Sequence, residues 1–71
     1  MLVKKGDIFE LDSVNGHHYT MEIINVNELR PPEMIYACDI WMDNNRDANY
    51  YNQTGDYYFC GINDLLKWNR N

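Results

Sequence analysis

Apolar and polar residues alternate along much of the chain, which is the pattern of β-strands that turn one face toward a core. The alternation is clearest over residues 34–42, where it predicts a strand with one apolar face and one wetter face marked by Asp39. The first face carries Met34, Tyr36, Cys38, Ile40 and Met42, and the second carries Ile35, Ala37, Asp39 and Trp41.

Two earlier segments alternate in the same way and predict a hairpin. Residues 7–12 form its first strand and residues 17–26 its second. Between them, Asn15 and Gly16 are a strong turn signal, because both residue types tolerate positive φ. The apolar phase of the second strand switches at Ile23 and Ile24, which predicts a β-bulge at that point.

The second half of the chain predicts a further hairpin and a short helix. Residues 50–53 are expected to pair with residues 57–60. Asn63 is expected to cap a helix over residues 64–68, where an early Asp and a late Lys suit the helix dipole. Two prolines in the loop over residues 27–33 are expected to hold that loop extended.

The five short strands follow one another in meander order on a chain of 71 residues, which has room for one core and one domain spanning residues 1–71. Curling into a small barrel is the usual way to limit exposed strand edges. We therefore expect a mostly β fold, a five-stranded antiparallel SH3-like barrel with a short C-terminal helical turn whose Leu65 or Trp68 plugs one end. An OB-like barrel is the alternative.

The charge balance bears on the partner. Eleven acidic residues against six basic ones give a net charge of −5, and the basic residues are scattered rather than clustered. Direct nucleic-acid binding is therefore disfavoured, because it requires a cationic track. The chain has no apolar stretch long enough for a membrane span or a signal-peptide core, so a cytoplasmic protein is expected. The basic residues are Lys4, Lys5, Arg30, Arg46, Lys67 and Arg70.

Cys38 and Cys60 lie 22 positions apart without the close spacing of a metal-binding pair. In a reducing compartment such residues usually behave as small buried apolar side chains. We expect two free thiols, with Cys38 buried on the apolar face of its strand; a disulfide or a metal pair is the alternative.

Three segments carry a resemblance to known proteins: residues 3–9, residues 19–23 and the closing residues 64–68. In length and layout the whole chain resembles the short uncharacterised proteins of Bacillus phages and prophages. The resemblance implies an SH3-like barrel and a phage or prophage origin. It implies no activity and no site residues.

Two motifs raise the possibility of a metal site. Residues 43–47 match the first acidic and amide positions of a calcium loop, but Ala48 replaces the required Gly and Thr54 the closing Glu. His17 and His18, with the two cysteines as partners, suggest zinc, yet successive strand residues point to opposite faces. We expect no metal and no cofactor.

Catalytic signatures are missing from the sequence. Ser13 is the only serine, and it lies in a predicted turn. Glu10, Asp12 and Glu22 are expected to face one another across the first hairpin, but such a cluster on a small barrel is more often surface charge than an acid/base pair. We expect a protein that is not an enzyme.

The aromatic residues are the most informative ones. Tyr50-Tyr51 and Tyr57-Tyr58 are consecutive pairs, so at least one ring of each pair should lie at the surface, although both pairs padding a small core is the alternative. Surface Tyr and Trp beside acids are a common binding-site composition. The expected site comprises Trp41, Tyr50, Tyr51, Tyr57 and Tyr58, edged by Asp43, Asp47 and Asp56.

This composition predicts a monomeric protein-interaction module that modulates a host protein with a basic surface. The aromatic side chains should anchor the partner and the acids should steer its approach. Mimicry of DNA charge is a special case, which requires the acids to gather on one face. The alternative function is a nucleic-acid- or ligand-binding barrel that stacks bases on exposed rings.

Overall fold

A computed structural model of the chain describes residues 2–49, 51 and 55–71. It contains one antiparallel five-stranded sheet with the strand order β4-β3-β2-β1-β5. The strands are β1 (Ile8–Asp12), β2 (His18–Val26), β3 (Tyr36–Met42), β4 (Tyr58–Cys60) and β5 (Asn69–Arg70). A short helix, α1 (Ile62–Leu65), joins β4 to β5, and 3₁₀ turns η1 (Pro32–Met34) and η2 (Arg46–Ala48) flank β3.

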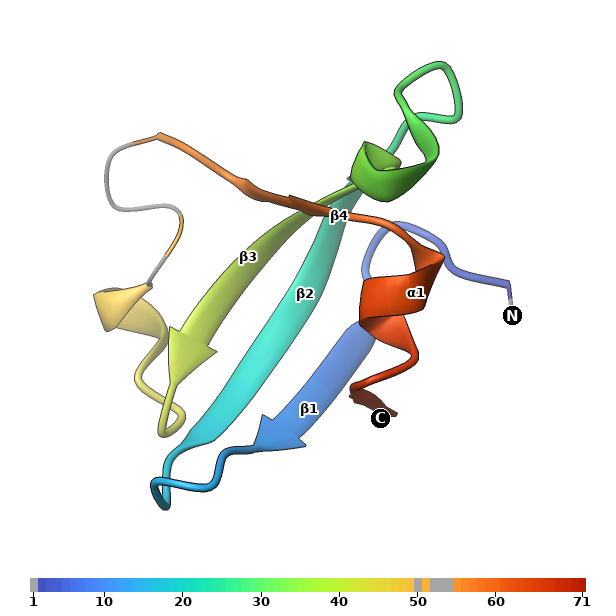
Figure 1. Cartoon of the computed structure of the whole chain (residues 1–71). Coiled ribbons are helices and arrows are strands. Elements are labelled where there is room, and N and C mark those ends of the chain that lie inside the picture. The colour runs from blue at the N-terminus through green and yellow to red at the C-terminus, as the bar shows by residue number, and fades with distance from the viewer. Residues whose placement is uncertain (1, 50, 52–54) are drawn as a thin grey trace.

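The mostly β fold and the short helix near the C-terminus are confirmed. The sheet is open, because β4 and β5 are its two outer strands and do not pair with each other in the described part of the chain. Figure 1 shows the segment from β4 through α1 crossing the upper end of the sheet and bringing the C-terminus beside β1. Within the residues described, no helix is long and apolar enough to cross a membrane.

The first hairpin forms as the sequence predicts. The Ser13 amide donates to the His17 carbonyl over 2.8 Å, and Gly16 takes the positive φ of 88° that lets the chain reverse. The predicted bulge is also confirmed, since the β2–β3 register shifts between Ile23 and Asn25. The bulge keeps the apolar residues of both halves of β2 in contact with the core.

The core lies between the inner face of the sheet and α1. Its fully buried side chains come from four strands and from the helix, and Trp68 packs against them from just beyond α1. The expected role of Leu65 in closing this end of the core is confirmed, because Leu65 is completely buried. The fully buried side chains are Phe9, Met21, Ile23, Cys38, Cys60 and Leu65.

Two local expectations were wrong, and a third falls largely outside the described residues. The prolines do not hold their loop extended, because Pro32 begins the 3₁₀ turn η1, which leaves Met34 38% exposed and off the core face. The helix cap is Gly61 rather than Asn63, since the Gly61 amide donates to the Asp64 carboxylate over 3.1 Å. Tyr51 lies in a turn, and the rest of the expected strand at residues 50–53 falls outside the described residues.

The second face of β3 is covered, not wet as expected. Asp39 is 6% exposed and Trp41 is 7% exposed. The physical reason is that η2 folds back over this face. Its Arg46 places the guanidinium 4.7 Å from the centre of the Trp41 ring and forms an ion pair with Glu22 on β2.

Candidate functional site

The residues expected to form one aromatic patch lie on opposite faces of the sheet. Trp41 is on the outer face, beneath Arg46. Tyr58 is opposite Cys38 in the β3–β4 register and therefore belongs to the inner face. Tyr51 packs against Tyr58, with ring centres 5.0 Å apart at an interplanar angle of 39°. Tyr57 remains 40% exposed, and Tyr50 lies outside the described residues.

The acids expected to edge that patch are dispersed as well. Asp47, in η2, and Asp56, before β4, are both exposed. Asp43 instead binds the start of the second strand of the first hairpin. Its carboxylate accepts a hydrogen bond from the His18 amide over 3.0 Å and lies 2.8 Å from Nδ1 of His17. The bond from the His18 backbone, followed by the His17 contact, lowers the pKa of Asp43.

The side chains of both histidines contact acids, His17 that of Asp43 and His18 those of Asp12 and Glu10. His18 Nδ1 lies 2.7 Å from Asp12 and its Nε2 lies 3.3 Å from Glu10, and hydrogen bonds to these two acids raise the pKa of His18. The Asn45 side chain accepts from the Ala48 amide, which places it within the η2 turn. Among the residues described, no three metal-ligating side chains gather as a metal site would require.

The acids of the outer face are held in an ion-paired arrangement. Glu22 and Asp39 face each other across β2 and β3, and burial, followed by the Glu22 charge, raises the pKa of Asp39. Arg46 opposes this shift and lies over Trp41 while pairing with Glu22. Because η2 covers these acids, a structural role fits them better than acid/base chemistry.

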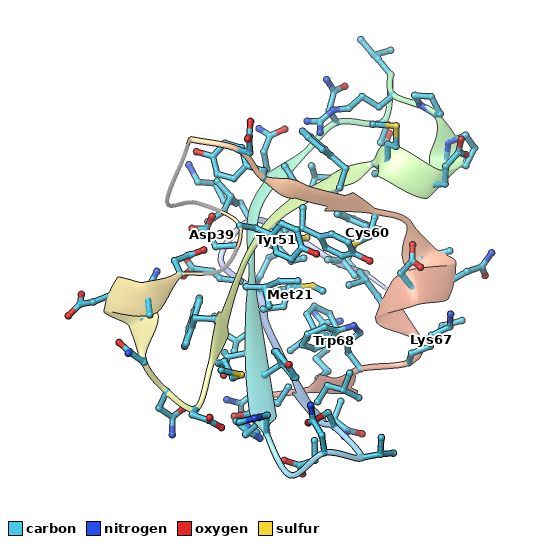
Figure 2. All side chains as sticks on the ribbon, turned by 60° about the vertical axis from the view of Figure 1, so that its left-hand side comes forward. Met21, Asp39, Tyr51, Cys60, Lys67 and Trp68 are labelled. Carbon is cyan, nitrogen blue, oxygen red and sulfur yellow. The ribbon has the colours of Figure 1, made fainter. Side chains whose placement is uncertain are left out.

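The inner face carries a groove of about 300 Å³ that opens to solvent. Four aromatic rings line it, together with two aliphatic side chains at its base. Figure 2 shows Tyr51 above Trp68 on this side of the sheet. The lining residues are Leu11, Tyr19, Ile40, Tyr51, Tyr58 and Trp68, and we call this site the ring-lined groove.

The strand lengths explain why the groove forms. β4 pairs with β3 only from Tyr36 to Cys38, so the inner face near Ile40 has no neighbouring strand on that side among the described residues. Side chains cover this part of the core instead. Tyr51 reaches it from the segment before β4, and Trp68 reaches it from the segment after α1. Rings from separate segments leave a gap between them, which is the groove.

Two of the six residues that line the groove were expected from the sequence to belong to a site. Tyr51 and Tyr58 were expected to contribute to a site, whereas Leu11 and Tyr19 were not. The missed signal was the hairpin register, because a turn at Asn15 and Gly16 sets Leu11 opposite Tyr19 and puts both on the Met21 face. Trp68 was expected only as a core plug, and it also lines the groove.

The two cysteines lie in the core behind the groove. Their sulfur atoms are 3.7 Å apart, both residues are fully buried, and both are free thiols, as the sequence predicts. Cys38 shares the buried face with Tyr36 and Ile40, but not with Met34. The hydrogen bond with Cys60 and the burial of the side chain raise the pKa of Cys38.

Comparisons with protein-family models, with curated proteins and with solved structures gave no match. The ring-lined groove is therefore the feature from which a function can be inferred, through its geometry and chemistry.

Proposed function

We propose that this chain is a non-catalytic protein-interaction module that receives a side chain of a partner protein in the ring-lined groove. One observation carries the proposal: four aromatic rings surround a solvent-open cavity of about 300 Å³. Pockets that hold whole small molecules span about 300–1,000 Å³, so this groove lies at the lower end of that range and has room for one protruding side chain.

The ring types suit a binding role. Tyr and Trp offer large contact areas with few rotatable bonds, and they dominate the energetic centres of protein interfaces. Tyr19, Tyr58 and Trp68 are only half-buried, so each retains surface for a partner to cover. Covering that surface would complete the burial of rings that already rest on the core.

The wider properties of the chain indicate the kind of partner. A net charge of −5 favours approach by a basic surface. The resemblance to phage and prophage proteins suggests that the partner is a host protein. We propose that this chain is a monomer and that it binds the partner in the cytoplasm. We further propose that the open sheet is a variant of an SH3-like barrel, because the strand order sets β1 between β2 and β5 and leaves β4 and β5 as neighbours in sequence across α1.

Two tyrosine variants test the site. The immobilised chain should capture a partner from a bacterial lysate, and the affinity of the purified partner is then measured for Tyr51→Ala and Tyr57→Ala. Both remove a tyrosine ring from the same stretch of chain, but only Tyr51 lines the groove. We expect Tyr51→Ala to weaken binding about 30-fold, the loss of one interface hot spot, and Tyr57→Ala to change it less than threefold.

The reverse result would place the site elsewhere. If Tyr57→Ala abolishes capture while Tyr51→Ala binds normally in a folded chain, the interface lies outside the groove. A titration with labelled single-stranded DNA and RNA at low salt addresses the alternative function. Tight binding that weakens steeply with added salt would replace the proposal with base stacking on the same rings.

A further inference from the structure

The aromatic rings outside the groove contact arginines of the chain itself. All three of its arginines lie over aromatic rings: Arg30 is 5.0 Å from the centre of Phe59, Arg46 is 4.7 Å from that of Trp41, and Arg70 is 5.7 Å from that of Phe9. Guanidinium groups stack on ring faces because they are planar and weakly hydrated.

The groove gathers four rings without a cation from the chain itself. None of the described side chains that line it is basic. Lys67 is the neighbour of Trp68 in sequence, but Figure 2 shows Trp68 directed toward the sheet and Lys67 on the opposite side of that segment. The groove therefore presents aromatic rings and no basic side chain in an acidic protein, and such rings attract a cation that reaches their faces.

The lining also discriminates among cations. No carboxylate is among the described lining residues, so a compact and strongly hydrated ammonium would lose water without gaining an ionic partner. A guanidinium loses less hydration and gains contact with ring faces. Burial, followed by the charge of Asp64 on α1, raises the pKa of Tyr58, so Asp64 provides negative charge close to the groove without lining it.

We propose that the side chain received by the ring-lined groove is an arginine of the partner protein, held by stacking of its guanidinium on the rings. This inference rests on the proposed function and adds the identity of the side chain. The partner's arginine would contact aromatic rings in the groove in the same way as the three arginines of this chain contact rings elsewhere.

Three peptides test the inference. Each is a short glycine–serine peptide with one central residue: arginine, lysine, or citrulline, which has the shape of arginine without its charge. Calorimetric titration of the unmodified chain gives the three affinities. We expect arginine to bind about tenfold more tightly than citrulline, which is the usual size of a partly desolvated cation–π interaction, and more tightly than lysine.

Tryptophan emission locates the bound peptide. In the Trp41→Phe variant, Trp68 is the remaining tryptophan, and its emission should change on addition of the arginine peptide. The matched Trp68→Phe variant keeps a ring in the groove and leaves Trp41 as the reporter on the opposite face, where no change is expected. If Trp41 emission responds instead, the arginine site lies on the outer face and the inference is wrong.

The affinities also separate this inference from the proposed function. Equal binding of the arginine and citrulline peptides would overturn recognition of a cation and leave the groove as a binding site. Lysine binding as tightly as arginine would overturn the preference for guanidinium. If no peptide binds up to millimolar concentration while Tyr51→Ala still weakens binding of the partner, the groove receives a different side chain and the inference is wrong.

Discussion

At the scale of single residues, neighbouring side chains differ sharply in exposure. Tyr57, which precedes β4, is 40% exposed, whereas Tyr58, the first residue of β4, packs against the core. Trp41 is buried because Arg46 folds back over its ring from η2, and no local pattern along β3 specifies that contact.

The contacts of His18 with Asp12 and Glu10 predict a pH dependence of stability. Hydrogen bonds to Asp12 and then Glu10 raise the folded-state pKa of His18 above its ordinary value of 6.5. A raised pKa means that protonated His18 stabilises the fold, so its contribution is complete below about pH 6.5 and is lost as the pH rises through the folded-state pKa. Urea unfolding of the unmodified chain should show a fall in stability over that range.

Two variants test whether His18 causes this loss of stability. His18→Gln removes the titrating group, and Asp12→Asn removes the main cause of its raised pKa, so both should flatten the pH dependence above about pH 6.5. A fall of unchanged size in both variants would mean that other groups produce it.

The buried cysteines predict thiols that are protected by the fold. Cys38 and Cys60 are fully buried, and a raised pKa keeps Cys38 protonated and unreactive at neutral pH. A thiol-specific reagent should modify neither cysteine on the timescale of minutes in the native chain, and both at once after denaturation without reductant. Rapid modification of native protein, or no free thiol after denaturation, contradicts this arrangement.

At the scale of elements, segments with clear apolar alternation were correctly predicted as strands, whereas a strand without alternation was missed. β1, β2 and β3 lie within the predicted segments, and the phase switch in β2 is a bulge, because alternation and turn chemistry act over a few residues. β5 was missed, since Asn69 and Arg70 show no apolar alternation. Their position depends on distant partners, as Arg70 pairs with Asp7 and donates to the Leu2 carbonyl.

The start of α1 gives a prediction about packing between elements. A Cβ added to Gly61 would lie 2.3 Å from the Pro32 carbonyl oxygen, so η1 and α1 approach too closely for any larger residue. Gly61→Ala should lower the free energy of unfolding by about 1–3 kcal/mol through this overlap, as urea denaturation would measure.

Asn63→Ala is the matched control for Gly61→Ala, because it adds an alanine to the same short helix at an exposed position. It should change stability by less than about 0.5 kcal/mol. A larger loss for Asn63→Ala than for Gly61→Ala would restore Asn63 as the residue on which the helix start depends.

At the scale of the whole molecule, the short outer strand β4 links the fold to its function. The sequence predicted a small β domain with aromatic residues as the candidate site, and two of those residues, Tyr51 and Tyr58, line the groove. The sequence could not show that β4 pairs with β3 only from Tyr58 onward, or that Tyr19 and Trp68 both line the space beside Ile40. That arrangement depends on how separate segments pack across the sheet.

One measurement tests the central claim that a partner binds in the ring-lined groove. The chain has two tryptophans, and nitrogen-15 labelling of tryptophan gives one indole signal for each in a proton–nitrogen correlation spectrum. Trp68 lines the groove, whereas Trp41 is buried beneath Arg46 on the opposite face. If the partner binds in the groove, its addition should shift or broaden the Trp68 signal and leave the Trp41 signal unchanged. A moved Trp41 signal beside an unchanged Trp68 signal would contradict the claim.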